Sequence, residues 1–537
     1  MEKIYATGII LILIITIFST ISISSTGKII DSEISTQLIE QKPISSLPSS
    51  FSWRDIDGVD FTTPIRNQAP FASCETFAIV AAVETMVQKE VGYPFGCDLS
   101  EAHLYFYSGG NLNWGSYPEN DTNFLRDYGV PDEACWPYPK EKKLYPLNTT
   151  SPDWQNRTVR IKEWSYLPED PEAIKNALVT NGPVPTYFVV YDDFLKYKKG
   201  IYQHRWGKLR GIHYVCIVGY NDDPGYWIVK NSWGKNYQDE GWFNIKYGEC
   251  SIEKKSFLLT DVYGQFPIIY VDDDNINGPW NGSKNYPYKT IQDGINNAYE
   301  GWTVYVNNGT YYENVIVNKT INLDGENRET TVIDGGGIEH VVVIISPHCR
   351  ISGFTIRNSG NGAFDAGIKT LSLNSNTTIK NNIITNNRLG IFLNYAYEYS
   401  WNKVQANIIC NNTDGVYVHW ANNNIISHNI IEENSEDGIE FEATQFSEIS
   451  HNILKNNGKC GFYLRASSHR NKIHFNDFID NPVQAFFDGS VLNRWRRNYW
   501  SDSSRLLIRP ISGRLDRFNI PWRDFDINPT LRPNNSN

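Results

Sequence analysis

The first apolar segment of the chain is a nearly continuous run over residues 6–23. It follows Met1-Glu2-Lys3 and gives way to a Ser-rich stretch, an arrangement typical of an export signal. The run of about 18 residues is also close to the length that spans a bilayer. We therefore predict that residues 1–26 are a signal peptide or an uncleaved N-terminal membrane anchor, followed by a polar linker over residues 27–50.

The next region, residues 51–262, mixes two periodicities. Within residues 71–89 the apolar residues recur at helical spacing, which predicts an amphipathic helix. These residues are Phe77, Val80, Ala81, Val83 and Val87. Short apolar runs over residues 214–220 and 226–229 predict strands. Helical and strand patterns within one segment predict a single α+β domain.

After Pro267 the pattern changes to a repeat rich in Asn and Gly. Four aligned units carry glycines that are 25, 23 and 23 residues apart, at Gly390, Gly415, Gly438 and Gly461. Such a unit, predicted to hold two short strands, cannot bury its apolar face alone, so the coils must stack in parallel. We predict a parallel β-helix over residues 266–537, with a C-terminal cap and a helix within residues 286–298 that covers the first coil.

Alternation within the repeat separates inner from outer positions, because residues two apart share one face of a strand. The predicted inner residues are Ile391, Leu393, Val416, Val418, Ile439, Phe441, Phe462 and Leu464. One turn position repeats as Asn, predicted to bond to backbone, at Asn382, Asn407, Asn429 and Asn452. The outer residues form two columns, Phe392, Tyr417, Glu440, Tyr463 and Asn394, His419, Glu442, Arg465, with Trp420 beside them.

Composition and charge exclude several classes of function. A chain of 537 residues with 20% charged residues is expected to fold into at least two domains. A formal net charge of -11 without a Lys/Arg cluster argues against a nucleic-acid partner. The eight cysteines include no CxxC pair, and the Asp-rich segment at residues 273–278 has Lys284 where a calcium loop closes with Glu. We therefore predict no metal site and no cofactor. On loop length alone, Cys97 and Cys135 are the preferred disulfide.

Three residues in the first domain have the order of a nucleophilic site. Cys74 opens the predicted helix, where the helix dipole and free N–H groups favour a thiolate. His213, in GIHYVCIVGYN, is suited to take the thiol proton, and Asn231, in YWIVKNSWG, to orient the imidazole ring. Gln68, in RNQAPFASCETFA, supplies a side-chain amide for the oxyanion of a tetrahedral intermediate.

Taken in order, these segments resemble the papain-like cysteine peptidases over about residues 51–262. The resemblance implies that Cys74 is the nucleophile, His213 the base, Asn231 its orienting partner and Gln68 an oxyanion donor. It further implies four substrate-binding positions. They are Gly109 and Gly110, which offer backbone to an extended substrate, Tyr214 beside the substrate side chain, and Trp233, which shields the His213–Asn231 hydrogen bond.

Departures from the family pattern include one residue beside the nucleophile and one beside the histidine. Glu75 stands where the family has an aromatic residue after the nucleophile, and a carboxylate beside a thiolate raises the thiol pKa unless it is turned away or paired. Tyr214 follows the histidine where a small residue is common, so the family's specificity rules do not transfer to this chain.

Residues 266–537 resemble right-handed parallel β-helix proteins of the carbohydrate-binding and sugar-hydrolase type, through the entry IIYVDDDNINGPWNGSKNYPYKTIQDGINNA and the closing NYWSD. An outer face that combines rings, carboxylates and a guanidinium is suited to a glycan, although adjacent outward residues are by default a solvated surface. The candidate glycan residues are Tyr417, His419, Trp420, Glu440, Glu442, Tyr463 and Arg465.

The patterns together predict an exported cysteine peptidase, extracellular or at the cell surface, that cleaves proteins or peptides and is attached to a surface or a carbohydrate by its β-helix. Two other classes stay open. One is a non-catalytic surface adhesin, which Glu75 and Tyr214 favour. The other is a carbohydrate-active β-helix with a vestigial peptidase domain, which a carboxyl pair in a sugar pocket would favour.

Overall fold

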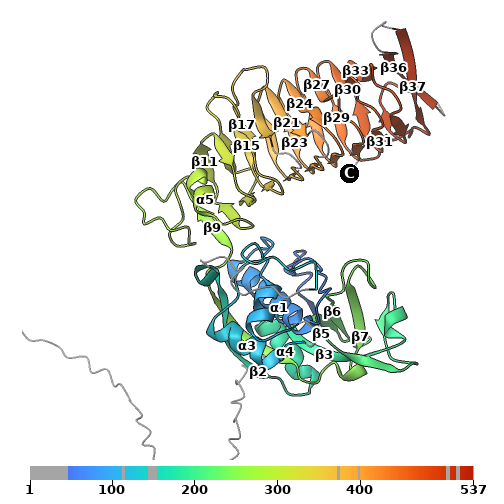
Figure 1. The fold of residues 1–537 in the computed structure, drawn as a ribbon. Helices are drawn as coiled ribbons and strands as arrows, with labels where there is room; N and C mark the ends of the chain where they lie inside the picture. Colours follow the sequence, from blue (N-terminus) through green and yellow to red (C-terminus); the bar gives the residue numbers. More distant parts are fainter. Residues whose placement is uncertain are drawn as a thin grey trace, which may run out of the picture.

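The computed structural model describes residues 46–111, 115–142, 154–371, 375–396, 400–503, 508–515 and 520–535. An α+β domain comes first and is followed by a long stack of short parallel strands (Figure 1). The predicted signal or anchor at residues 1–26 and most of the predicted linker lie outside the described residues. Among the described helices, none is long and apolar enough to cross a membrane.

The first domain packs helices against an open, twisted sheet. Its helices are α1 (Cys74–Val91), α2 (Glu101–Tyr107), α3 (Pro118–Asp127) and α4 (Pro171–Thr180), with short 3-10 turns η2 (Trp154–Arg157), η3 (Phe194–Lys196) and η4 (Glu249–Ser251). The sheet runs in the order β1 (Ser50–Ser52), β5 (Leu209–Asn221), β6 (Tyr226–Lys230), β7 (Trp242–Lys246) and β4 (Ile201–Tyr202), and β3 (Val184–Tyr191) pairs with β5. A separate ladder joins β2 (Val159–Tyr166) to β8 (Phe257–Gly264).

Helix α1 is the central element of this domain. It begins at Cys74, as the pattern predicted, and ends at Gly92, whose φ of 90° is a left-handed conformation that glycine adopts without strain. The helix packs against β5 and β3 and is buried along most of its length. This burial fixes the helix N-terminus, and Cys74 with it, against the sheet.

The second domain is a parallel β-helix with three strands in each coil, where the sequence predicted two. One sheet contains β12 (Val315–Val317), β15 (Val342–Ile344), β18 (Ala366–Thr370), β21 (Leu389–Ala396), β24 (Asp414–Ala421), β27 (Asp437–Glu442), β30 (Cys460–Arg465) and β33 (Val483–Asp488). A second contains β9 (Ile268–Val271), β10 (Thr303–Val306), β13 (Asn322–Gly325), β16 (Arg350–Ser352), β19 (Thr378–Lys380), β22 (Lys403–Gln405), β25 (Ile425–Ser427), β28 (Glu448–Ser450), β31 (Lys472–His474) and β34 (Arg494–Arg496). The third contains β11 (Gly309–Tyr312), β14 (Thr331–Asp334), β17 (Thr355–Arg357), β20 (Ile383–Thr385), β23 (Ile408–Cys410), β26 (Ile430–Glu432), β29 (Ile453–Lys455), β32 (Asp477–Ile479) and β35 (Tyr499–Trp500). The extra strand, such as β22 or β25, was missed because it lies between the aligned units of the repeat.

Buried asparagines hold the corners of the coils. Asn407 donates its backbone N–H and its side-chain amide to Asn429 Oδ1, both at 3.0 Å, and also donates to the Ile379 carbonyl at 2.9 Å. Asn382, Asn429 and Asn452 repeat this pattern, so the predicted Asn turn is confirmed. A second ladder, which the sequence reasoning did not identify, contains Asn387, Asn412, Asn434, Asn457 and Asn481. Both ladders satisfy buried amides completely.

The interior and the ends of the β-helix follow the predicted pattern. All eight predicted inner residues are fully buried in one continuous core. Helix α5 (Ile291–Asn297) is shorter than the predicted segment, but it covers the first coil through Ile291 and Ile295. At the other end, β36 (Ile508–Leu515) and β37 (Ile520–Ile527) form an antiparallel hairpin that pairs with the last coil.

Polar and aromatic contacts join the two domains directly. Trp302 of the β-helix donates to Asp132 of the first domain at 3.0 Å, and Asp132 forms a buried ion pair with Arg157 at 2.6 Å. Tyr93 of the first domain donates to Asp324 of the β-helix at 2.8 Å. Because only residues 265–267 separate β8 from β9, the β-helix begins as a continuation of the first domain.

The predicted disulfide is wrong. All eight cysteines lie within the described residues, and none forms a disulfide. Cys97 is buried in the first core and its backbone N–H donates to Gln88 Oε1 at 3.2 Å, whereas Cys135 closes a turn with Asp132. Loop length says nothing about where the two Cβ atoms point, and a disulfide needs them to face each other.

Candidate active site

A buried hydrogen bond orients the imidazole of His213. His213 lies in β5 and Asn231 directly follows β6, and the two side chains meet with 2.8 Å between Nε2 and Oδ1. The indole of Trp233 stacks on the imidazole, with ring centroids 4.4 Å apart and 24° between the planes. Gln238, which the sequence reasoning missed, accepts from the Asn231 amide at 3.0 Å. These contacts fix the ring and leave Nδ1 as the nitrogen that can exchange a proton.

Cys74 lies at the contact between α1 and β5. Its thiol donates to Glu75 Oε2 at 3.5 Å, and the backbone N–H of Tyr214, the residue after His213, bonds to the sulfur. The packing of α1 on β5 therefore brings the thiol beside the histidine segment, although 139 residues of sequence separate Cys74 from His213.

The surroundings favour the neutral forms of both groups in the resting site. Burial raises the pKa of the Cys74 thiol and the Glu75 carboxylate raises it further, whereas the Tyr214 N–H acts in the opposite direction. Burial lowers the pKa of His213 to about 4, and the bond to Asn231 opposes this shift. Burial thus acts against both the thiolate and the imidazolium, and opposes the helix N-terminus that favours a thiolate.

The amide of Gln68 is held in one orientation. Its Oε1 accepts from Ser232 Oγ at 2.7 Å, and Nε2 donates to the Phe71 carbonyl at 3.4 Å. An amide nitrogen carries two hydrogens, so the second N–H remains for another acceptor. Ser232 and Tyr138, whose hydroxyl donates to the Gln68 carbonyl at 2.7 Å, were missed. Only Ser232 had a signal in the sequence, because it directly follows Asn231.

Part of the backbone predicted to bind substrate already forms a hydrogen bond within the protein. The Gly110 N–H already donates to the Tyr105 carbonyl at 2.8 Å, and a Cβ on Gly110 would lie 2.6 Å from the Tyr105 ring. Gly109 has a φ of 109°, and a Cβ placed on it would meet no other atom within 4 Å. Tyr214 is half-buried, with its ring 5.9 Å from that of Tyr187. Residues 112–114, which continue the predicted segment, lie outside the described residues.

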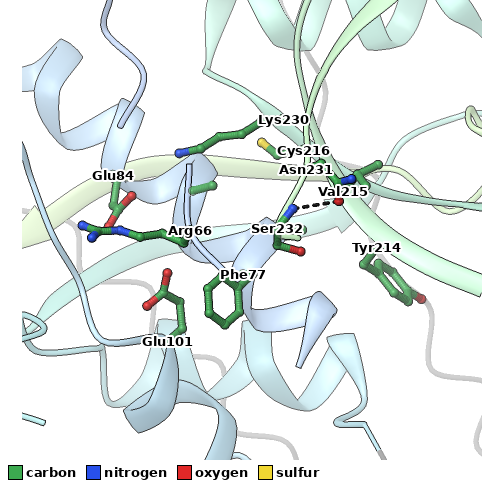
Figure 2. A pocket seen from close by; sticks show the side chains of 12 residues that line it. Arg66, Phe77, Glu84, Glu101, Tyr214, Val215, Cys216, Lys230, Asn231 and Ser232 are labelled. Carbon is green, nitrogen blue, oxygen red and sulfur yellow. Dashed lines mark hydrogen bonds between the residues drawn. The ribbon is translucent and has the colours of Figure 1, made fainter. Parts of the chain in front are cut away.

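A small cavity lined by both charged and apolar side chains lies behind the site (Figure 2). Arg66, Glu84, Glu101 and Lys230 line it together with Asn231, and its volume of about 10 Å³ is the size of one water molecule. Lys230 donates to Thr63 Oγ1 at 2.7 Å, and the Thr63 hydroxyl donates to Glu84. This network anchors the end of β6 immediately before Asn231.

The predicted outer columns of the β-helix exist, but their rings are not free. The register pairs Phe392 with Tyr417 and Tyr417 with Glu440, as predicted. The Phe392 and Tyr417 rings stack at 5.1 Å and are buried, and the Tyr417 hydroxyl donates to Glu442. Arg465 forms ion pairs with both Glu440 and Glu442. Most of this predicted face is therefore satisfied by internal contacts.

The other candidate glycan residues lie at the edges of the same face. His419 Nδ1 lies 3.2 Å from Asn394 Oδ1, and the neighbouring Trp420 is about half exposed. The ammonium of Lys459 lies 5.6 Å above the Tyr463 ring. A pocket opens on this face, and of the candidate residues His419, Trp420 and Tyr463 only Tyr463 lines it.

At that pocket, of about 370 Å³, the structure gathers three carboxylates that the sequence reasoning did not recognise as a cluster. Asp414 and Glu440 line the pocket, and their oxygens lie within 4.8 Å of each other and of an oxygen of the buried Asp437. Each is already paired with a cation, because Arg388 lies 3.4 Å from Asp414, Lys459 lies 3.2 Å from Asp437, and Arg465 binds Glu440. Burial raises the pKa of Asp437 to about 6. The overlooked signal is an Asp-Gly pair repeated in two successive units.

Comparison with known proteins gives two family matches. The model described as papain family cysteine protease matches residues 47–260, and the model described as periplasmic copper-binding protein (NosD) matches residues 295–505. The second match falls on the parallel β-helix, and the predicted right-handed type is confirmed.

Individual relatives match the first domain. Cathepsin B-like CP3 of Giardia intestinalis is 48% identical over 235 residues, which cover 39% of this chain and 73% of that protein. A gut-specific cysteine proteinase of Caenorhabditis elegans is 43% identical over 242 residues, covering 39% of this chain and 72% of that protein. Among solved structures, proCathepsin B S9 from Trypanosoma congolense is 26% identical with a TM-score of 0.36, covering 40% of this chain and 78% of that one.

Proposed function

The chain belongs to the papain family of cysteine proteases through its first domain, and from this premise we propose that it is an exported peptidase that uses Cys74, His213, Asn231 and Gln68. The observation that carries the proposal is the buried His213–Asn231 hydrogen bond of 2.8 Å beneath Trp233, beside a half-buried cysteine at a helix N-terminus. The domain limits, residues 51–262 and 266–537, belong to the same proposal.

The proposed reaction proceeds through a thioester. His213 Nδ1 takes the thiol proton as Cys74 Sγ attacks the scissile carbonyl, and the oxyanion accepts from the Gln68 amide and the Cys74 backbone N–H. The tetrahedral intermediate collapses, the C–N bond breaks, and His213 returns the proton to the leaving amine. Water then adds to the thioester with His213 as base, which releases the acid and restores the thiol.

The proposed location is outside the cell. The apolar run at residues 6–23 has the composition of an export signal or anchor, and NosD, which the second domain resembles, is described as periplasmic. The copper binding named for NosD is not carried over. Among the described residues, the group with metal-ligand spacing contains carboxylates only, which suit hard cations and not copper, and each is already paired.

The β-helix is proposed to attach the peptidase to an acidic glycan through the 370 Å³ pocket. Cations and carboxylates both line the pocket, and Glu436, whose side chain is 50% exposed, is one of the lining carboxylates. The side chains of Lys459 and Arg465 are 57% and 38% exposed, whereas those of their partners Asp437 and Glu440 are 0% and 13% exposed. Two cations that are more exposed than these carboxylate partners are suited to bind the carboxylate of a uronic acid.

The first test is labelling of the full chain with an epoxide probe, with peptide cleavage measured in parallel. We expect Cys74 to be labelled, and cleavage to fall by a factor on the order of 10³ or more in Cys74→Ala and His213→Ala. Cys410→Ala is the matched control, because Cys410 is also a half-buried free thiol but lies in the β-helix. Labelling of Cys74 at the rate of Cys410, without cleavage, would favour the non-catalytic adhesin.

A further inference from the structure

Glu75 touches the nucleophile but has no part in the reaction described above. It is the second residue of α1, and its Oε2 accepts from the Cys74 thiol at 3.5 Å. The other carboxylate oxygen lies against Gly115, where a Cβ would come within 2.7 Å of it and within 3.0 Å of the Ala72 carbonyl. Only a glycine at position 115 leaves room for the carboxyl group in this place.

The groups that face Glu75 provide no positive charge to neutralise it. Among the described residues, no lysine or arginine forms an ion pair with this carboxyl. Its neighbours are the thiol on α1, Tyr105 on α2, Asp121 on α3 and Tyr214 on β5. Glu75 contributes, after burial, to the raised pKa of each of these four groups, to about 12 for Tyr105 and about 7 for Asp121. The carboxyl is therefore easier to protonate than an exposed one, and burial raises its pKa to about 7.

The two charge states of Glu75 have opposite effects on the sulfur. A protonated carboxyl can donate its O–H to a thiolate, which stabilises the anion. An ionised carboxylate can only accept from the thiol and repels a thiolate at the same distance. We infer that Glu75 is a positioning residue that permits the Cys74 thiolate only when its own carboxyl is protonated, and so confines the peptidase to acidic and neutral conditions.

This inference predicts an unusual pH dependence. When His213 takes the thiol proton, the thiolate–imidazolium pair holds as many protons as the thiol and the neutral imidazole together, so the balance between these two forms does not change with pH by itself. Ionisation of Glu75 as the pH rises through about 7 makes that pair less stable. Reactivity therefore falls with rising pH, whereas the reactivity of an ordinary thiol rises.

The experiment compares the full chain with Glu75→Gln and Glu119→Gln from about pH 5 to about pH 9. Two quantities are measured, kcat/KM on a peptide and the rate of Cys74 alkylation by iodoacetamide. The amide introduced by Glu75→Gln copies the shape and the donor of the protonated carboxyl. Glu119, on α3, supplies a matched loss of charge without contact to the sulfur; its carboxylate accepts from the Tyr166 hydroxyl.

In the unmodified chain and in Glu119→Gln, we expect both quantities to fall about tenfold as the pH rises through about 7. A tenfold change corresponds to a shift of about one unit in the thiol pKa. In Glu75→Gln we expect the value at acidic pH to persist across the range. An equal fall in Glu75→Gln overturns the inference. Should Glu75→Gln not fold, Glu75→Asp, which draws the carboxylate back from the sulfur, is expected to show a smaller fall than the unmodified chain, and an unchanged fall overturns the inference.

The inference deepens the proposed peptidase function and rests on it for the cleavage step. The inference about Glu75 and the proposed peptidase function can fail independently of each other. If no peptide is cut, the proposed function fails, while the alkylation profile still tests Glu75. If peptide is cut and the profile of Glu75→Gln matches that of the unmodified chain, only the role of Glu75 fails.

Discussion

The two domains bury polar groups in opposite ways. Behind the candidate active site, the charged residues Glu84, Glu101 and Lys230 are buried around one small cavity, which the partly exposed Arg66 also lines. In the β-helix, neutral amides are buried in repeating ladders, each bonded to the same position in the next coil. A charged cluster depends on every partner, because an unpaired buried charge is costly, whereas a ladder distributes the same requirement over many equal steps.

The largest effect on this comparison is expected from Lys230→Met. The change removes the cation that opposes the negative charge of Glu84 and the donor to Thr63. We expect a loss of about 3–5 kcal/mol in the free energy of unfolding of the first domain at neutral pH, measured by denaturant titration.

The control for Lys230→Met is the double variant Lys230→Met with Glu84→Gln, which is expected to regain most of the loss because no charge is left unpaired. The pH dependence gives a second check. Burial raises the Glu84 pKa and Lys230 lowers it, so without the lysine the carboxyl protonates more readily. The loss should therefore shrink as the pH falls. A loss that stays equal at all pH values would mean that packing, not charge, is responsible.

A smaller effect is expected from Asn429→Leu, in the middle of a ladder. Asn429 Oδ1 accepts two bonds from Asn407 at 3.0 Å, and its amide donates to Asn452 Oδ1 at 2.9 Å. The change leaves these partners buried and unsatisfied, which should lower the free energy of unfolding of the β-helix by about 2 kcal/mol in the same titration.

Lys403→Leu is the matched control for Asn429→Leu, since it places the same side chain on an exposed position of a nearby strand. Its effect is expected to stay within about 0.5 kcal/mol. If both leucine variants destabilise equally, the amide ladder does not carry the stability assigned to it.

The smallest effect concerns the outer face of the β-helix. Lys459→Gln removes the most exposed cation of the pocket rim, and should weaken binding of trigalacturonate about fivefold in calorimetry, the effect of one surface charge. Lys472→Gln, an exposed lysine on β31, should leave binding unchanged. Equal binding of the neutral trisaccharide maltotriose would contradict an acidic ligand.

Regular features of the molecule were predictable because they repeat or obey a period. The eight inner residues and one Asn ladder followed from alternation and from the spacing of Gly390, Gly415, Gly438 and Gly461. The start of α1 at Cys74 followed from helical periodicity. The third strand of each coil, such as β22, did not, because it lies between the aligned units, and corners with positive φ such as Ala406 carry no composition signal.

The sequence by itself determined the order of the two domains, the family of the first, the repeat of the second, and the residue types that can carry out thiol chemistry. Only the tertiary structure decided which polar groups meet. It left Cys97 and Cys135 without a disulfide, buried the Tyr417 ring, gathered Asp414, Asp437 and Glu440, and set Glu75 against the thiol of Cys74. Periodicity is a local property that a sequence displays directly. The charge state of a side chain depends on burial and on neighbours from other strands and helices, and these exist only once the chain has folded.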